Sequence, residues 1–139
     1  MVYTLLDHAT DALVEVRADS MHHALEDAAY AAIDIMLDRE RVGSAEIRRV
    51  SVESDTIHDM LYGWLEEIIY QTVTEGFAVR AVGVSYLHEA GRHTVRARLE
   101  GEPLDVRRHR FRVEIKAPTY HEMSISQNGC TSMRFLMDL

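Results

Sequence analysis

The sequence predicts an α+β fold in which two amphipathic helices pack on a largely antiparallel sheet or sandwich, in the order β-α-β-α followed by four or five strands. Three observations predict this class. Two segments carry apolar residues at helical spacing, most of the remaining apolar residues alternate with polar ones, and turn-forming residues separate the alternating runs. With 139 residues, 47% of them hydrophobic, the chain is expected to form a single domain over residues 1–139.

The two helical segments are expected over about residues 21–38 and 56–74. In both, apolar side chains recur at i, i+3 and i+4 and form one stripe along the helix. Asp19 or Ser20 is placed to cap the start of the first helix, and Asp55 to cap the second. Each stripe is wide enough to pack against a sheet.

The strands are expected where apolar and polar residues alternate with period two. The Asn-Gly pair within residues 127–129 is a strong hairpin signal, and residues 89–92 form a second turn. The expected strands are residues 12–17, 47–52, 77–87, 93–99, 109–116, 120–126 and 132–138.

The charge balance disfavours nonspecific capture of nucleic acid. The chain has 23 acidic and 15 basic residues and a net charge of −8, so phosphate backbones are repelled on average. The charges are distributed unevenly: residues 51–79 contain acids and no lysine or arginine, whereas residues 92–112 contain seven arginines. An oriented partner or ordinary solvated faces would both explain this asymmetry.

Several classes of protein are excluded or disfavoured by motifs that the sequence lacks. The longest apolar runs fall well short of the roughly 20 residues that span a bilayer, and the first residues do not resemble a signal peptide. Cys130 is the only cysteine, which excludes an internal disulfide. A phosphate loop, a nucleophile elbow and an HExxH motif are all missing. We therefore expect a cytoplasmic protein without membrane contact, and the motifs of these enzyme classes give no support for catalysis.

The most unusual chemistry lies near the two ends of the sequence. Asp11 ends a polar stretch between apolar strand segments, and the sequence closes with Asp138 followed by Leu139 and its α-carboxylate. Adjacent carboxylates at the end of a strand suit a hard cation such as Ca²⁺, Mg²⁺ or Mn²⁺. A frayed, solvated terminus would produce the same pattern without binding a metal. The apolar residues of this terminal segment favour the other interpretation, in which the terminus is docked into the sheet.

A second unusual feature is the identity of the basic residues. Lys116 is the only lysine among the fifteen basic residues. A coding bias towards arginine would produce this skew. However, arginine cannot replace a compact ammonium group where geometry is tight, so Lys116 is a candidate functional residue.

These residues, taken with others along the chain, resemble the archease family. The stretch from Tyr3 to Asp11 is similar to the family's opening signature, an aromatic residue followed by Leu-Asp-His-Thr-Ala-Asp. Four further blocks follow in the family's order over nearly the full length: Leu25–Ala29, Trp64–Phe77, Lys116–His121 and Asp138-Leu139.

The resemblance implies a function and a site. It implies a non-catalytic partner of an RtcB-type RNA ligase that acts in tRNA splicing and RNA repair. In that role it would promote guanylylation of the ligase's active-site histidine and multiple turnover, and it would meet RNA only through the ligase. The implied metal ligands are Asp11, Asp138 and the C-terminal carboxylate of Leu139, with Ca²⁺ expected first and Mg²⁺ or Mn²⁺ as alternatives. The implied activation residue is Lys116.

Two other function classes use the same residues differently. A small metal-dependent hydrolase would use the same carboxylates, although no nucleophile or base is evident beside them. An RNA-binding chaperone would use the arginine-rich stretch of residues 92–112, although the net charge opposes it. Nucleotide turnover by the isolated protein would favour the hydrolase, and salt-sensitive RNA binding without ligase would favour the chaperone.

Overall fold

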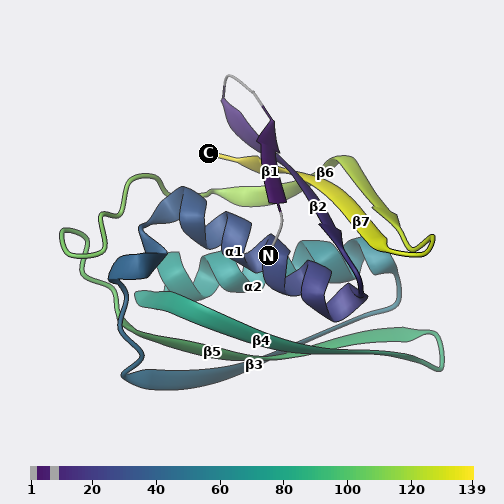
Figure 1. Ribbon diagram of the computed structural model, residues 1–139, viewed down its shortest axis with the longest axis horizontal. Helices are drawn as coiled ribbons and strands as arrows, with labels where there is room; N and C mark the ends of the chain where they lie inside the picture. Colours follow the sequence, from purple (N-terminus) through teal and green to yellow (C-terminus); the bar gives the residue numbers. More distant parts are fainter. Residues whose placement is uncertain (1–2, 7–9) are drawn as a thin grey trace.

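Two antiparallel sheets enclose two helices in the computed structural model, which describes residues 3–6 and 10–139 (Figure 1). In this part of the chain the first sheet has the strand order β1-β2-β7-β6 and the second the order β3-β5-β4. The α+β prediction is therefore confirmed. The elements are β1 (Tyr3–Leu6), β2 (Asp11–Ala18), α1 (Met21–Met36), the 3₁₀ turn η1 (Arg39–Arg41), β3 (Glu46–Ser54), α2 (Ile57–Val73), β4 (Phe77–Glu89), β5 (Arg92–Pro103), β6 (Ala117–Ser126) and β7 (Thr131–Asp138).

Both helices begin at residues that cap their free amide groups. The Ser20 hydroxyl accepts a hydrogen bond from the His23 amide at 3.3 Å at the start of α1. The Thr56 hydroxyl accepts one from the Asp59 amide at 3.1 Å at the start of α2. The cap expected at Asp55 is wrong by one residue, because the extended backbone at Thr56 places its hydroxyl over the first turn.

The helices fill the space between the sheets. Alanines on α1 allow this helix to lie close to both sheets and to α2, and the Trp64 indole nitrogen of α2 donates to the Leu25 carbonyl of α1 at 2.8 Å. Neither α1 nor α2 has the length and apolar character needed to cross a bilayer. The fully buried apolar residues of the two helices are Ala24, Leu25, Ala28, Ala29, Ala31, Ala32, Ile33, Met36, Met60, Leu61, Trp64, Leu65 and Ile68.

The segment 109–116, predicted to be a strand, is an irregular connection. Its first half is hydrogen-bonded to the end of α1, and its backbone reaches a strand at Lys116, whose amide donates to the Asp138 carbonyl of β7. The Asp38 amide donates to the His109 carbonyl, and the Arg112 amide donates to the Met36 carbonyl, both at 2.8 Å. A partner distant in sequence has therefore overridden the local alternation of polar and apolar residues.

The side chain of Arg112 explains why this connection runs past the end of α1. Its guanidinium group donates to the Asp34 and Leu37 carbonyls at 2.6 and 2.9 Å. The last turn of α1 contains no basic residue of its own. Arg112 therefore supplies the positive charge that favours the carbonyl end of a helix.

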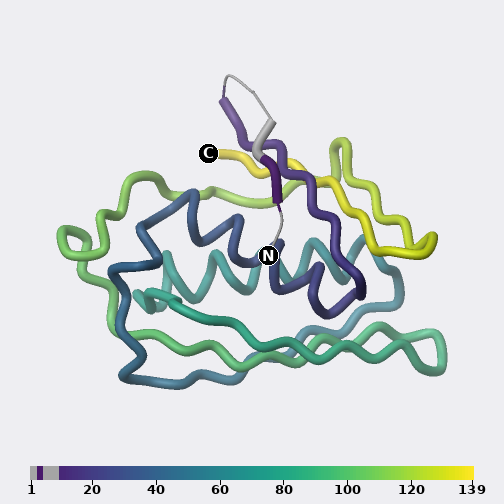
Figure 2. Tube along the Cα trace, in the orientation of Figure 1, coloured from purple at the N-terminus to yellow at the C-terminus, as the bar shows by residue number. Residues whose placement is uncertain are grey.

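Strands from the two ends of the sequence lie side by side in the first sheet, as the chain trace shows (Figure 2). β2 pairs with β7 along its whole length, and β1 and β6 flank this central pair. β1 is held further by the Tyr3 hydroxyl, which donates to Asp34 of α1 at 2.7 Å. Burial and this hydrogen bond raise the pKa of Tyr3 to about 12.

Candidate functional site

The two predicted carboxylates lie opposite each other on adjacent strands of the first sheet. Asp11 is the first residue of β2 and Asp138 is the last residue of β7, and the two are direct partners in the antiparallel register. Directly opposed residues project their side chains from the same face, with Cβ atoms about 4.5–5.5 Å apart. The fold therefore brings together two acids from opposite ends of the sequence.

Lys116 lies at the same corner. Ala117, the first residue of β6, is the register partner of Asp138 on the other side of β7. The Lys116 amide donates to the Asp138 carbonyl at 2.8 Å, and the lysine side chain is exposed. We call Asp11, Lys116, Asp138 and Leu139 the carboxylate corner.

The next row of the sheet makes the surroundings of these acids apolar. Leu13 and Leu136 are register partners, two residues along from Asp11 and Asp138, and thus lie on the same face. They are only 6% and 4% exposed. Apolar neighbours lower the local dielectric constant, which strengthens the electrostatic interactions of the nearby carboxylates relative to open water.

The following row does not add a free acid. Glu15 and Arg134 are also register partners and form an ion pair, with the Arg134 Nε atom 3.1 Å from the Glu15 carboxylate. The hydrogen bond and charge of Glu15 raise the pKa of Arg134. This row therefore contributes no unpaired acid to the face.

The end of the chain is held beside Asp138. Leu139 is half-buried and packs against the apolar core, which keeps its backbone close to the corner. Its α-carboxylate would add a third oxygen-bearing group to the two aspartates. Three such groups match the donors that Ca²⁺, Mg²⁺ and Mn²⁺ prefer.

The side chains alone do not make a complete metal cage. In residues 3–6 and 10–139, no group of three or more histidine, cysteine, aspartate or glutamate side chains is arranged to hold a metal ion. Asp7, His8 and Ala9 of the opening signature lie outside the described residues. Two carboxylate side chains by themselves suit a cation that shares its coordination with water or phosphate.

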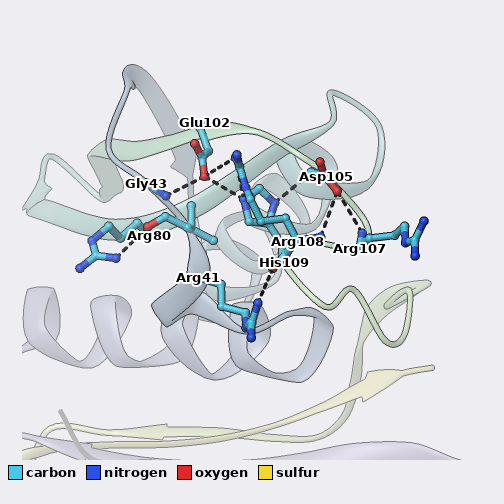
Figure 3. A network of polar contacts seen from close by, with 9 residues as sticks. Arg41, Gly43, Arg80, Glu102, Asp105, Arg107, Arg108 and His109 are labelled. Carbon is cyan, nitrogen blue, oxygen red and sulfur yellow. Dashed lines mark hydrogen bonds and ion pairs between the residues drawn. The ribbon is translucent and has the colours of Figure 1, made fainter.

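Sequence reasoning missed a polar network on the connection that leads to Lys116 (Figure 3). Glu102 accepts from the Gly43 amide at 2.7 Å, and it lies 2.8 Å from His109 Nε2 and 2.7 Å from the Arg108 guanidinium. His109 is completely buried, and its Nδ1 atom accepts from the Asp105 amide at 3.0 Å. No motif could have signalled this network, since its members come from three separate segments.

This network determines the electrostatics of its central acid. The Gly43 amide and the His109 ring hold the pKa of Glu102 down at about 2, with a further contribution from the Arg108 charge. Backbone amides of Arg108 and Arg107 similarly lower the pKa of Asp105. Both acids stabilise the connection between β5 and β6, and neither is directed at the carboxylate corner.

Comparison with known proteins identifies relatives over the whole chain. Residues 3–139 match the Archease protein family (MTH1598/TM1083). The chain is 31% identical to Protein archease of Methanopyrus kandleri over 140 residues, covering 100% of both chains. It is also 31% identical to Protein archease of Pyrococcus abyssi over 121 residues, covering 87% of this chain and 85% of the relative.

A solved structure has the same architecture. The solution structure of protein 1598 of Methanobacterium thermoautotrophicum matches with a TM-score of 0.83 and 27% identity, covering 99% of this chain and 98% of that one. The arrangement of two helices between antiparallel sheets is therefore shared with an experimentally determined relative.

Proposed function

The chain belongs to the archease family, and from this premise we propose that it is a non-catalytic protein cofactor of an RtcB-type RNA ligase in the cytoplasm. In this role it promotes guanylylation of the ligase's active-site histidine and supports multiple turnover in tRNA splicing and RNA repair. The observation that carries the proposal is the register of Asp11 with Asp138 beside Lys116. These three residues are far apart in sequence and lie at one corner of the sheet, where Lys116 and Asp138 are exposed and Asp11 is half-buried.

The carboxylate corner would hold a divalent cation through Asp11, Asp138 and the α-carboxylate of Leu139. Like charges directly opposite each other in a sheet are destabilising, so a cation between Asp11 and Asp138 relieves their repulsion. Ca²⁺, Mg²⁺ and Mn²⁺ all accept such oxygen donors. When bound, the cation supplies positive charge that can neutralise a nucleotide triphosphate.

Lys116 would act on the ligase side of the corner. Its backbone is anchored to Asp138 while its side chain is exposed, so the ammonium group can reach a partner without moving the sheet. A lysine ammonium is a compact point charge that suits a single phosphate oxygen or a carboxylate. The proposed role is to contact a phosphate of the nucleotide or an acid of the ligase.

The decisive experiment measures ligase self-guanylylation under multiple-turnover conditions with Mn²⁺ or Mg²⁺. Wild-type protein should stimulate the reaction, and Asp138→Asn should not, because it keeps the shape of the side chain and removes its charge. Glu46→Gln is the matched control, since it removes one exposed carboxylate from β3 in the other sheet. It should stimulate as well as wild type.

Each other outcome discards a named part of the proposal. Equal stimulation by Asp138→Asn would retain the ligase partner and remove the metal role of this residue. A lack of stimulation by the wild-type protein with its cognate ligase would reject the cofactor role. Nucleotide hydrolysis by the protein alone, lost in Asp138→Asn, would replace that role with a metal-dependent hydrolase.

A further inference from the structure

The second sheet has one face that no helix of the described residues covers. α1 and α2 lie on one side of β3, β4 and β5, and the other side faces solvent (Figure 1). Along β5 the buried residues Val95, Ala97 and Leu99 point to the helices, and Arg96 and Arg98 between them are exposed. This alternation is typical of an antiparallel sheet with one solvated face.

Arginines gather in two neighbouring rows of this solvated face. Residues directly opposed in the register share a face, and successive rows on one face are about 6.8 Å apart along the strand. We call these two rows the arginine face; one row consists of Arg49, Arg98 and Gly83, and the next of Ser51, Arg96 and Ser85.

The arginine face is hollowed. All six of its residues line a depression of about 630 Å³. A Cβ atom added at Gly83 would meet nothing within 4 Å, so the space above this residue is open. Glu26 is the one acid in the lining, and its carboxylate accepts a hydrogen bond from the Val84 amide at 2.9 Å. The hollow therefore has an excess of positive charge in a chain of net charge −8.

Two of the three arginines have no acidic partner among residues 3–6 and 10–139. Arg98 lies 3.7 Å from the Glu100 carboxylate, whereas neither Arg49 nor Arg96 forms an ion pair with any residue in the described part of the chain. Arg49 and Arg98 are directly opposed, and opposed like charges are destabilising. An anion between them would relieve this repulsion and gain bidentate hydrogen bonds from planar guanidinium groups.

We propose that the arginine face binds the phosphate backbone of single-stranded RNA. Guanidinium and hydroxyl groups are the donors that proteins direct at phosphate and sugar oxygens, and here three arginines and two serines present them in adjacent rows. The rows contain no aromatic side chain on which bases could stack, so binding is independent of base sequence. This goes beyond the ligase cofactor role, in which RNA is met only through the ligase.

An acidic protein partner fits this surface less well. Protein interfaces depend on large apolar or aromatic anchors near their centre. The exposed apolar residues of this sheet face, Ile47 and Leu87, lie in rows outside the arginine face and on different strands. The chain's many acids do not prevent a local contact, because charges beyond about 10 Å are largely screened at 0.1 M salt.

The test is fluorescence anisotropy of a labelled oligouridine of about 12 nucleotides with the isolated full-length protein. We expect a dissociation constant between about 1 and 100 µM. Three phosphate contacts predict that binding weakens about twenty-fold between 50 and 200 mM salt. The variant Arg49→Gln/Arg96→Gln should weaken binding at least ten-fold.

The matched control is Arg17→Gln/Arg107→Gln, which removes the same charge from exposed positions on β2 and on the connection after β5. It should bind RNA nearly as well as wild type. Gly83→Glu is a second test variant that places an acid in the open part of the hollow, and it should abolish binding. Circular dichroism and urea unfolding verify that each variant is folded.

Three outcomes would overturn the proposal. These are the absence of RNA binding by the wild-type protein, an equal loss in the test and control pairs, and tighter binding of an oligoglutamate peptide than of RNA. The second would attribute binding to overall charge, and the third to an acidic protein partner. Since no ligase is present, none of these results bears on the proposed cofactor role.

Discussion

His109 donates and accepts hydrogen bonds at the same time, and Glu102 receives the donated one. The Nε2 atom lies 2.8 Å from the Glu102 carboxylate, while Nδ1 accepts from the Asp105 amide at 3.0 Å. Because Nδ1 accepts from a backbone amide, Nε2 carries the ring proton that is donated to Glu102. The pair joins the end of β5 to the connection that carries Lys116.

The depressed pKa of Glu102 predicts a loss of stability in acid. Its pKa is about 2 in the folded protein against an ordinary value of 4.5, so the charged carboxylate stabilises the fold fully above pH 4.5. This contribution is lost as the pH falls from about 4.5 towards 2. Urea unfolding at several pH values should show that Glu102→Gln is less stable than wild type at neutral pH and that the difference shrinks in acid. A difference that is constant with pH would contradict this assignment.

A side chain at Gly101 should destabilise the protein by a steric clash, and Gly83 in the same sheet provides a control position. A Cβ atom at Gly101 would lie 1.9 Å from the Ala78 carbonyl oxygen of the neighbouring strand, so Gly101→Ala must push β4 and β5 apart. We expect it to cost about 1–3 kcal/mol or more in the free energy of unfolding. Gly83→Ala, in the open hollow of the same sheet, should change it by less than about 1 kcal/mol. Similar losses in the two variants would refute the steric explanation.

Substitution of Trp64 should show how much the contact between α1 and α2 contributes to the free energy of unfolding. The Trp64 side chain is fully buried and its indole donates to the Leu25 carbonyl. Trp64→Phe removes this donor and leaves a small cavity, which should cost about 2–4 kcal/mol. Denaturant unfolding measures this loss. A cost below about 0.5 kcal/mol would mean that the core repacks around the smaller ring and that the hydrogen bond is dispensable.

The carboxylate corner predicts cation binding that depends on both aspartates. Titration calorimetry with Ca²⁺ or Mn²⁺ should give at least ten-fold weaker binding for Asp11→Asn and for Asp138→Asn than for wild type, because each removes a charged oxygen ligand. Residues appended after Leu139 should also weaken binding by moving the α-carboxylate. Glu46→Gln is the control and should bind like wild type. Unchanged affinity in the extended protein would remove the Leu139 carboxylate from the site.

Substitution of Lys116 should slow ligase activation without changing the stability of the protein. The Lys116 side chain is exposed, so Lys116→Arg should leave stability and cation affinity unchanged. The broader guanidinium group cannot replace a compact ammonium in a tight phosphate contact, so ligase activation should fall at least ten-fold. Single-turnover guanylylation assays measure this. Wild-type activation by Lys116→Arg would exclude a specific role for the ammonium.

Much of the local structure could be predicted because it depends on neighbours in sequence. The helical stripes predict α1 and α2 to within two residues at each end, since burial of one face is repeated every turn. The hairpins at residues 90–91 and 128–129 follow from residues that tolerate a positive φ, which is 74° at Gly91 and 80° at Gly129.

Other features depend on contacts between residues that are distant in sequence, and only the tertiary structure reveals them. Alternation alone predicted a strand over residues 109–116, but the free carbonyl groups at the end of α1 offered better hydrogen bonds to Arg112. The Glu102 and His109 network likewise has no signature in the sequence. Composition showed arginines concentrated in residues 92–112, yet only the strand register sorts Arg96 and Arg98 onto one open face with Arg49.

For the candidate site, the sequence alone identified Asp11, Lys116 and Asp138 as unusual, by residue type and by resemblance to a family. It could not derive their proximity, because residue types and periodicity say which segments are strands and not which strands pair. Pairing is decided when both sheets bury their apolar faces against the same two helices. That burial aligns β2 with β7, and the resulting register sets Asp11 opposite Asp138.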